Sequence, residues 1–487
     1  MNVLNEIAET RRQRILREGA TLGVPLPELR ASPLVPFGRD PFVICEIKRR
    51  SPSRGEIVRD LDPVAQAARY VAAGIRSISV LTEADHFGGS LADLLAVKKA
   101  FPQAALLRKD FLLSEEDIEL SHRAGADAVL LIAALLDPGL LATMHRRATE
   151  LGMAALVEVH TVQEIDKVRD CRPELVGVNS RDLATFHVDR LLPVRLRPLI
   201  DWPCRTVFES GIYAREDSAL AVNAGYSGVL VGEAVMRAPA RIPDIVAGIR
   251  DPGADGRFWA RLFGRSAHAA RTRLTRPLVK ICGLTNAEDV GFADSLGADL
   301  LGFIFAESPR RVDPALLRRL PPTRAQRVAV VVLNVRADDM DTNVTSLLSE
   351  GLIDAVQLHG DETPDAVRAL GFPRYKALRP TAPGELDQVS EYGTLRVLVD
   401  AYSGKAYGGT GKQIAPEIAL AARKQGPLWI AGGIGADNVA QVVEDYEPEL
   451  IDASSRLESV PGRKDHALLR RFFREVSITA GGMGEST

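Results

Sequence analysis

The chain has 487 residues, 46% of them hydrophobic, so it is long enough to bury two cores. Its formal net charge is only −3, and charged residues are mixed along the sequence, without the basic stripe or acidic tail that would indicate nucleic-acid or membrane partners. We therefore expect its partners to be small molecules.

The cysteines and the first residues bear on the compartment. Cys45, Cys171, Cys204 and Cys282 show neither CxxC spacing nor the density of a disulfide framework, which suits a reducing compartment. The start of the chain carries acidic residues and no apolar signal-peptide core, and the apolar runs are far shorter than the ~20 residues of a membrane span. We expect a cytoplasmic protein.

Residues 1–40 precede any predicted strand. Within them, the spacing of Leu4, Ile7, Ala8 and Ile15 predicts an amphipathic helix. We expect this extra helix to cap the domain that follows it.

Short runs rich in valine, isoleucine and leucine recur evenly along the chain. Each is followed by a helix-like stretch, which predicts parallel sheet with crossover helices. The first series is expected at residues 42–46, 77–81, 105–109, 128–132, 154–159, 175–179, 206–209 and 228–231. The second series is expected at residues 278–282, 300–305, 327–333, 355–358, 374–377, 397–400, 428–431 and 450–452.

The number of predicted strands in each series indicates the fold. Two sets of eight, each within roughly 200–250 residues, favour closed barrels over doubly wound sheets, which usually have about five or six strands. The predicted fold class is therefore α/β, with two tandem (β/α)8 TIM barrels, the first of which carries the extra N-terminal helix.

The same series predict the domain boundaries. We expect the first barrel over residues 1–250 and the second over residues 277–478. Residues 251–276 begin with DPGADG and continue with an aromatic and arginine-rich stretch, which predicts a linker with some helix. Residues 479–487 are small and polar, so we expect a disordered tail.

A weak internal repeat relates the two halves. FESGI (208–212) followed by LVGEAV (230–235) corresponds to IAGGI (430–434) followed by IDASSR (451–456), at the seventh and eighth predicted strands of each half. The loops after these strands bind phosphate in such barrels, because glycines let backbone N–H groups approach the anion and a short helix adds its positive end. One glycine-rich loop is often only a tight turn, but the same pattern in both halves favours two phosphate sites.

Polar residues end nearly every predicted strand of the first half. Side chains at the carboxyl ends of barrel strands face the active site, although any one of them alone is better explained as an exposed strand end or a surface ion pair. Their convergence on one barrel mouth favours a functional site, because the burial of so many charges needs a reason. They are Glu46, Lys48, Lys109, Glu158, Asn179, Arg181, Glu209 and Ser210.

Residues 1–250 contain, in this order, EIKRRSPSRG, FGGSLADL, LLRKDF, ALVEVHT, VGVNSRDL and VFESGI, and this ordered set resembles the indole-3-glycerol-phosphate synthase family. That family closes an indole ring from 1-(o-carboxyphenylamino)-1-deoxyribulose 5-phosphate with loss of carbon dioxide and water, and without metal or organic cofactor. The resemblance implies that protein side chains supply every proton.

The resemblance also implies roles for individual residues. Lys109 is expected to be the general acid that protonates the ketone as the aromatic carbon attacks, with Glu46 and Glu158 tuning its proton transfer. The two glutamates are also expected to be the acid and base of ring closure and dehydration, and either could serve either step. The remaining members of the catalytic set are Lys48, Asn179 and Glu209. The substrate-binding set is Ser51, Ser210, Gly211 and Gly232 for phosphate, Arg181 with Lys48 for the carboxylate, and Phe111 for the aromatic ring.

Cys282 ends the first predicted strand of the second half, in LVKICGLT. A cysteine in a strand is usually inert core packing, but the position at the strand mouth favours a functional thiol. A thiolate needs an electropositive site, which Arg310 and a phosphate-loop helix could provide. Asp400 ends another strand and offers an acid on the opposite side. A cysteine base facing an aspartate acid suits an aldose-to-ketose rearrangement.

Residues 277–475 contain KICGLT, GFIFAESPRR, VQLHG, VLVDA, YGGTGK, IAGGI and IDASSRLESVPGRKD, a set that resembles the phosphoribosylanthranilate isomerase family. The resemblance implies that Cys282 is the general base, that Asp400 is the general acid that opens the ribose ring, and that Arg310 binds the anthranilate carboxylate. It also implies substrate-binding roles for His359, Gly432, Gly433, Asp452, Ser454 and Ser455. No metal and no cofactor are expected.

Three features of the second half call for separate interpretation. Arg456 stands where a small residue is usual in that family, and the loop before Arg310 is short, so either departure could alter affinity. GGTGK (408–412) is not a nucleotide P-loop, because Ala406 stands where the first glycine belongs and Gln413 where serine or threonine belongs. We interpret this segment as a glycine-rich lid.

The two implied reactions are consecutive, since the second barrel would produce the ketose that the first consumes. This predicts a bifunctional enzyme of tryptophan biosynthesis. The Amadori isomerase of histidine biosynthesis is the closest rival for the second half, but it uses a pair of aspartates, unlike Cys282 with Asp400. A catalytically inactive binding protein would be expected to lack the acids and bases at the strand ends, yet Lys109, Glu158, Cys282 and Asp400 are all present. A monomer is compatible with the sequence, and we expect the intermediate to pass between the sites by free diffusion.

Overall fold

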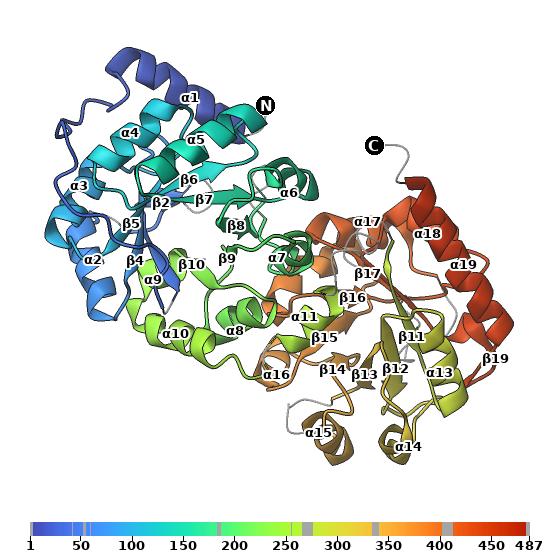
Figure 1. Ribbon diagram of the computed structural model, residues 1–487. Coiled ribbons are helices and arrows are strands. Elements are labelled where there is room, and N and C mark those ends of the chain that lie inside the picture. Colours follow the sequence, from blue (N-terminus) through green and yellow to red (C-terminus); the bar gives the residue numbers. More distant parts are fainter. Residues whose placement is uncertain are drawn as a thin grey trace. The chain divides into compact units, whose positions relative to one another are not determined.

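The computed structural model describes residues 3–40, 42–51, 55–58, 60–182, 187–254, 256–264, 276–333, 340–401 and 413–483. The chain divides into two compact units, residues 1–267 and 268–487. Each unit has strands at its centre and helices outside them (Figure 1). Within the described ranges, no helix is both long enough and apolar enough for a membrane crossing.

The first unit is built on a closed sheet of parallel strands. Their order around the barrel is β1, β10, β9, β8, β7, β6, β5 and β4. The strands are β1 (Val43–Ile47), β4 (Ser77–Leu81), β5 (Ala105–Lys109), β6 (Ala128–Ile132), β7 (Ala154–Val159), β8 (Leu175–Asn179), β9 (Arg205–Glu209) and β10 (Gly228–Val231). The predicted eight-stranded barrel is confirmed in the described residues, with small shifts at some strand ends.

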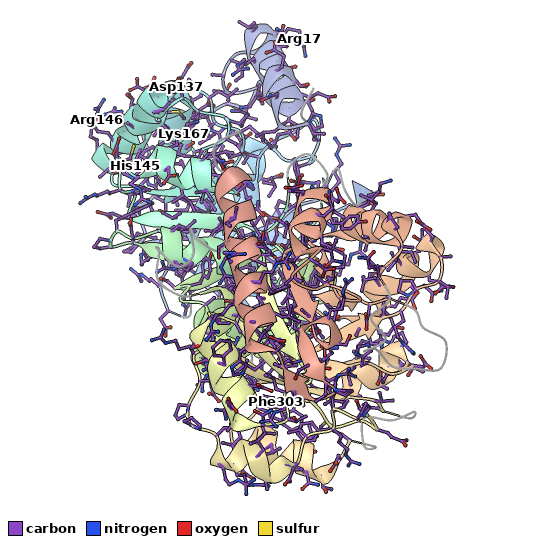
Figure 2. The ribbon with its side chains drawn as sticks, turned by 90° about the vertical axis from the view of Figure 1, so that its right-hand side faces the viewer. Arg17, Asp137, His145, Arg146, Lys167 and Phe303 are labelled. Atoms are coloured by element: carbon purple, nitrogen blue, oxygen red, sulfur yellow. The ribbon has the colours of Figure 1, made fainter. Side chains whose placement is uncertain are left out.

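The second unit repeats this architecture, and its strands close in chain order from β11 to β18. They are β11 (Leu278–Cys282), β12 (Leu300–Ile304), β13 (Gln326–Val331), β14 (Ala355–Leu358), β15 (Arg374–Leu378), β16 (Val397–Val399), β17 (Trp429–Ile430) and β18 (Leu450–Ala453). Phe303 of β12 is fully buried in the core of this unit (Figure 2). The predicted second barrel is therefore confirmed, and the polar residue Asp400 directly follows β16.

Helices connect the strands of the first unit and cover the barrel. They are α2 (Pro63–Ala72), α3 (Leu91–Ala100), α4 (Glu115–Arg123), α5 (Pro138–Glu150), α6 (Val162–Val168), α7 (Leu192–Leu196), α8 (Arg215–Asn223), α9 (Glu233–Arg237) and α10 (Ile242–Arg250). Polar caps explain where several begin: the side chains of Asp62, Ser90, Ser114 and Asp137 accept hydrogen bonds from backbone N–H groups in the first turns of α2, α3, α4 and α5.

The second unit has a corresponding set of helices. They are α13 (Ala287–Ser295), α14 (Pro314–Arg319), α15 (Thr342–Ser349), α16 (Pro364–Ala369), η4 (Pro383–Tyr392), α17 (Pro416–Gln425), α18 (Val439–Tyr446) and α19 (His466–Met483). The backbone of α19 continues into the segment 479–487 for which the sequence predicts a tail. The predicted linker contains α11 (Arg257–Phe263), which buries the aromatic residues Phe258, Trp259 and Phe263 together with Leu262.

Two small hairpins were not predicted. One joins β2 (Arg50–Ser51) to β3 (Gly55–Glu56) after the first strand, and the other joins β19 (Glu458–Val460) to β20 (Arg463–Lys464) after the last strand of the second barrel. Their strands are too short to give a periodic hydrophobic signal. Both hairpins follow the carboxyl ends of barrel strands, so they lie on the side where functional residues gather.

The predicted N-terminal helix is present as α1 (Val3–Glu18). It buries Leu4 and Ile7 in the core of the first barrel, while Arg17 extends into solvent (Figure 2). Arg11 is buried on the same helix and binds Asp110 at 2.9 Å and Asp117 at 2.6 Å. A cluster of buried opposite charges therefore anchors the helix to the barrel beside the last residue of β5.

We predict that Arg11→Ala releases α1 locally from the barrel. The substitution leaves two buried carboxylates short of a partner, and breaking such a pair costs on the order of 3 kcal/mol, so amide exchange in α1 should accelerate about 100-fold. Hydrogen-exchange mass spectrometry of the whole chain measures this rate. The matched control is Arg12→Ala, whose side chain is 53% exposed in a surface pair with Glu9 and should leave the exchange unchanged. Equal protection in the two variants would contradict the anchoring role.

Candidate functional site

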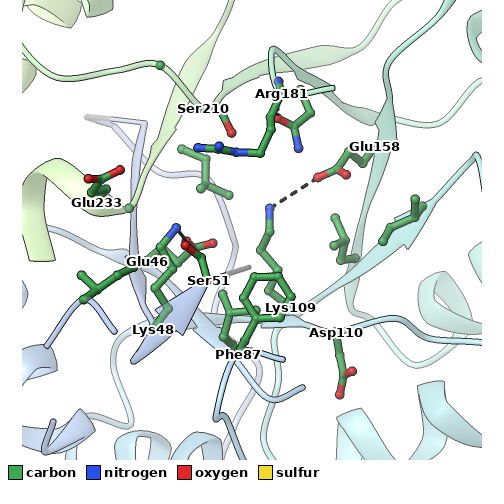
Figure 3. Close-up of a pocket in the computed structure, with 18 of the residues that line it drawn as sticks. Glu46, Lys48, Ser51, Phe87, Lys109, Asp110, Glu158, Arg181, Ser210 and Glu233 are labelled. Carbon is green, nitrogen blue, oxygen red and sulfur yellow. Dashed lines mark hydrogen bonds and ion pairs between the residues drawn. The ribbon is translucent and has the colours of Figure 1, made fainter. Parts of the chain in front are cut away.

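A pocket opens at the carboxyl ends of the strands of the first barrel (Figure 3). The parallel register brings the ends of β5, β7 and β8 to this rim. Every predicted site residue of this half lines the pocket except Glu209, which lies against Lys109. The lining residues are Glu46, Lys48, Ser51, Lys109, Phe111, Glu158, Asn179, Arg181, Ser210, Gly211 and Gly232.

Lys109 lies at the centre of these charges. Its ammonium donates to Glu209 Oε2 at 2.8 Å and lies 3.4 Å from Glu158 Oε2, a contact drawn in Figure 3. Burial lowers the pKa of Lys109, but the carboxylates of Glu209, Glu158 and Glu46 raise it by more, so its pKa is well above the ordinary value. The lysine is therefore protonated at neutral pH and is held as a proton donor facing the pocket.

The carboxylates around Lys109 are not equivalent. Burial raises the pKa of Glu158, but Lys109 and His160 more than offset burial, and the net pKa is lowered. Glu209 has the opposite balance, because burial and the neighbouring Glu158 raise its pKa more than Lys109 lowers it. The two glutamates are close enough to compete for one proton. The pair thus places an ionised carboxylate, Glu158, in the pocket lining, with the more readily protonated Glu209 next to Lys109 behind it.

Glu46 forms a second charged pair in the pocket, with Lys48 at 2.6 Å. Burial raises the pKa of Glu46, but Lys48 and Lys109 outweigh burial and lower it. A side chain at Gly232 would meet this pair, since an added Cβ would lie 2.6 Å from Glu46 Oε1 and 2.8 Å from Lys48 Nζ. The glycine after β10 therefore leaves room for the pair and exposes its own backbone to the pocket.

The loop after β9 is suited to an anion. Ser210 and Gly211 have φ angles of 65° and 73°, and Ser210 is one of the few non-glycine residues with a left-handed backbone. Gly211 has no side chain, so a ligand can approach the backbone of this turn closely. Arg181 also lines this pocket, and its backbone N–H donates to Asn179 Oδ1 at 3.1 Å. The predicted phosphate and carboxylate ligands therefore share one cavity.

Sequence reasoning missed several residues around this pocket. Leu4 and Ile7 of α1 line it, so the extra helix forms part of its wall. Phe87 lies opposite Phe111, with ring centroids 6.2 Å apart, and also lines the pocket. His160 contacts Glu158. The signal that could have found His160 was its spacing, two residues beyond a candidate catalytic glutamate at the end of a strand.

In the second barrel, Cys282 lies at the end of β11 above a buried lysine on the same strand. Lys280 is fully buried and donates to Asp452 Oδ2 at 2.6 Å and Gln357 Oε1 at 2.5 Å. A Cβ added at Gly302 on the neighbouring strand would lie 2.7 Å from Cys282 Sγ and 3.0 Å from Lys280 Cε. The thiol and the lysine stem therefore both cover this glycine, and both face the barrel interior.

A polar chain continues across the barrel from Gln357. Its amide lies 2.8 Å from His359 Nδ1, and the other ring nitrogen of His359 lies 3.2 Å from Asp400 Oδ2. Tyr375 donates to Gln357 Oε1 at 2.9 Å. Cys282 and Asp400 both occupy strand ends in a parallel barrel, so they share one rim, as predicted for a base and an acid.

Arg310, which was expected to provide positive charge near Cys282, binds a carboxylate instead. Arg310 lies close to the strand end, with Cδ 2.8 Å from the position of a Cβ at Gly283, but its guanidinium binds Glu458 at 2.8 to 3.0 Å. The cations that lower the pKa of Cys282 are Lys280 and Lys464, and burial outweighs them, so the net pKa is raised. The pairing of Arg310 with Glu458 depends on the unpredicted hairpin β19–β20.

The predicted phosphate ligands of the second half follow β17 and β18. Gly432 and Gly433 have left-handed φ angles of 95° and 59°, and a Cβ at Gly432 would lie 2.6 Å from that of Ala401. Ser454 donates to the carbonyl oxygen of Cys282 at 3.0 Å, and Ser455 begins a short 3-10 turn. Arg456 donates to the carbonyl oxygen of Gly433 at 3.0 Å, so it links the two loops. The predicted glycine-rich lid lies outside the described residues.

A glycine on β8 has a steric role in the first pocket. A Cβ built on Gly177 would lie 1.9 Å from Glu209 Oε1, closer than any real contact of this kind. Gly177 also pairs in register with Glu158 of β7. The missing side chain on β8 therefore gives the carboxylate of β9 the space to reach Lys109.

Comparison with known proteins gives a consistent family for each half. The family model for indole-3-glycerol phosphate synthase matches residues 29–245, and the family model for N-(5'phosphoribosyl)anthranilate (PRA) isomerase matches residues 279–475. An indole-3-glycerol phosphate synthase of Nocardioides sp. is 44% identical over 248 residues, covering 49% of this chain and 94% of that protein.

Relatives that match both halves also exist. A tryptophan biosynthesis protein of Phytophthora nicotianae is 30% identical, covering 85% of this chain and 87% of its own length. A multifunctional tryptophan biosynthesis protein of Phycomyces blakesleeanus is 31% identical and covers 90% of this chain. The chain spans only 62% of that multifunctional relative.

We predict that Gly177→Ala destabilises the first unit by about 1–3 kcal/mol, because the added methyl group displaces a buried carboxylate. Each variant is equilibrated at increasing urea concentrations and treated briefly with a protease. The peptides of residues 1–267 then report the urea concentration at which the first unit unfolds. Gly139→Ala is the matched control, since its Cβ would meet only Asp137 Oδ1 at 3.3 Å. If both variants unfold at the same urea concentration, the packing of Glu209 over Gly177 is not as described.

Proposed function

The chain belongs to the tryptophan-biosynthesis family that joins an indole-3-glycerol phosphate synthase to a PRA isomerase, and we propose that it catalyses both reactions in succession. The second barrel isomerises N-(5-phosphoribosyl)anthranilate to 1-(o-carboxyphenylamino)-1-deoxyribulose 5-phosphate. The first barrel converts this ketose to indole-3-glycerol phosphate with loss of carbon dioxide and water. The observation that carries the proposal is the ammonium of Lys109, which is only 16% exposed and faces the pocket among three carboxylates.

In the first barrel, the substrate phosphate binds the loops of Ser210, Gly211 and Gly232. Lys109 donates a hydrogen bond to the ketone oxygen, and its proton moves to that oxygen as the aromatic carbon bearing the carboxylate attacks. Carbon dioxide then leaves, and its bonding electron pair restores the aromatic ring. Glu46 and Glu158 supply the acid and base that remove the new hydroxyl group as water.

Other groups of the first pocket bind and orient the substrate. Arg181 and Lys48 bind the carboxylate that will be lost, and Asn179 binds a hydroxyl group. The apolar side of the pocket, which includes Phe111 and Phe87, packs against the aromatic ring. The lining combines apolar with charged side chains, so it can bind the aromatic ring as well as the charged groups of the substrate.

In the second barrel, Asp400 protonates the ring oxygen of the ribose so that the ring opens. As the ring C–O bond breaks, the lone pair of the anthranilate nitrogen forms a C=N double bond to C1 of the sugar. Cys282, as a thiolate, then takes the proton from C2 to give an enol, and return of a proton to C1 yields the ketose. His359 touches Asp400 and holds the acid in place, while Asp452 is held by Lys280. Gly432, Gly433, Ser454 and Ser455 bind the phosphate, and Arg310 binds the anthranilate carboxylate next to Glu458.

We also propose a cytoplasmic monomer that needs neither nucleic acid nor membrane for its activity. Support for the compartment comes from the four cysteines, all of which are free. Sedimentation velocity of the purified chain tests the monomer.

Lys109→Ala should abolish indole formation while the ketose accumulates, because the second barrel is untouched. We expect a loss of roughly 10²- to 10⁴-fold in kcat/KM, the usual contribution of a positioned general acid. Purified protein is supplied with enzymatically generated phosphoribosylanthranilate, and both products are followed by chromatography. Lys99→Ala, which removes an exposed lysine from α3, should behave as the wild type. Undiminished indole formation in Lys109→Ala would refute the assignment.

Cys282→Ala should have the complementary effect. Production of the ketose should fall by roughly 10²- to 10⁴-fold because the base is missing, whereas added ketose should still be converted to indole-3-glycerol phosphate at the wild-type rate. Cys171→Ala is the control, since this half-buried cysteine belongs to the first unit. The assignment fails if Cys282→Ala and Cys171→Ala isomerise equally fast.

A further inference from the structure

His160 follows β7 and is buried between two carboxylates. Its Nδ1 lies 3.2 Å from Glu164 Oε2, and its Nε2 lies 3.4 Å from Glu158 Oε1, at ion-pair distance. The backbone N–H of His160 also donates to Glu164 Oε2 at 2.8 Å. The ring is only 8% exposed.

The start of α6 fixes the outer carboxylate. Thr161 is the N-cap, and its hydroxyl oxygen accepts from the backbone N–H of Glu164 at 3.1 Å. The same hydroxyl donates to Glu164 Oε1 at 3.1 Å, which leaves Oε2 for His160. The capping residues of a short helix thus hold a carboxylate against an imidazole at the edge of the first pocket.

This geometry determines the charge of the ring. A neutral imidazole carries one N–H group and leaves its other nitrogen as an acceptor facing a carboxylate, whereas an imidazolium presents an N–H group to each of the two carboxylates. Burial lowers the pKa of His160, but Glu158 and Glu164 raise it to about 10. These two carboxylates are the charged groups that act on the ring directly, while Lys109 and Glu209 reach it through Glu158.

The charge of His160 distinguishes Glu158 from its neighbour. Glu158 lies 3.4 Å from each of two cations, Lys109 on one oxygen and His160 on the other. Glu209 shares Lys109 at 2.8 Å but has no contact with His160 among the described ion pairs. Of two adjacent buried carboxylates that compete for one proton, the one with the additional cation stays ionised.

We propose that His160, held as an imidazolium between Glu158 and Glu164, is a positioning residue that keeps Glu158 ionised and leaves the shared proton on Glu209. Glu209 is then the acid and Glu158 the base of this pair in the resting enzyme. The catalytic part of the inference rests on the proposed synthase function, while the charge assignment does not. It narrows the roles proposed above, because a Glu158 that is ionised in the resting enzyme begins the reaction as a base.

The charge assignment is tested by nuclear magnetic resonance of the full chain with labelled histidine, in which His160 is identified by its absence in His160→Asn. We expect the ring to remain protonated at pH 8 and to titrate near 10. Glu164→Gln should lower the midpoint by about one pH unit or more, because it removes one of the two flanking charges. Glu116→Gln, at an exposed first-turn position of α4, should not. A wild-type midpoint near the ordinary value of 6.5 would overturn the assignment.

The effect on the carboxyl pair is tested by infrared spectroscopy and by the pH profile of kcat/KM for added ketose. The proton shared by Glu158 and Glu209 should be lost near pH 8 in the wild type. His160→Asn should raise the pH of this loss by about one pH unit, because it removes a cation that favours the ionised pair. The protonated-carboxyl band reports the shift whether or not the protein makes indole. A lower rate at every pH without a shift of the band would mean a merely structural role and would overturn the proposal.

Discussion

Parallel pairing in a closed sheet imposes the main constraint on this protein. All strands of a barrel run in one direction, so the side chains at their carboxyl ends must share one small rim. Charges brought together in this way lose most of their hydration, and they remain buried only if each has an opposite charge within contact distance. The arrangement of Lys109 among Glu46, Glu158 and Glu209 satisfies this requirement. It also shifts the pKa values away from their ordinary range, so packing and acid–base chemistry have the same physical origin.

Both barrels make room for these groups in the same way, by omitting a side chain on an adjacent strand. Gly177 gives space to Glu209 in the first barrel, and Gly302 gives space to Cys282 and Lys280 in the second. A barrel interior is normally filled by layers of bulky side chains, so a glycine there would leave a void. Here the long polar side chain from the neighbouring strand occupies that volume. The weak repeat seen in the phosphate loops is thus accompanied by a similar packing solution near the reactive groups.

The sequence was sufficient to predict the strands, the two barrels and the gathering of Lys109 with its carboxylates, because each depends on local hydrophobic runs that end in polar residues. The N-terminal helix was predicted from the spacing of its apolar residues, which is also a local signal. Partners that are distant in the chain could not be predicted. The hydrophobic pattern does not distinguish Lys280 from other strand residues. In the fold it binds Asp452 and Gln357, and Gln357 also accepts a hydrogen bond from Tyr375. Arg310 was expected to be available for a ligand, but the two-residue strand β20 ends a hairpin that brings Glu458 to it. No periodicity identifies such pairings.

The position of α1 has a practical consequence for handling the protein. Leu4 and Ile7 form part of the pocket wall, and Arg11 binds Asp110, the residue next to Lys109. An affinity tag or fusion partner attached at the amino terminus would add its bulk within a few residues of the bound substrate. Kinetic constants for indole formation would therefore depend on whether such a group is attached there.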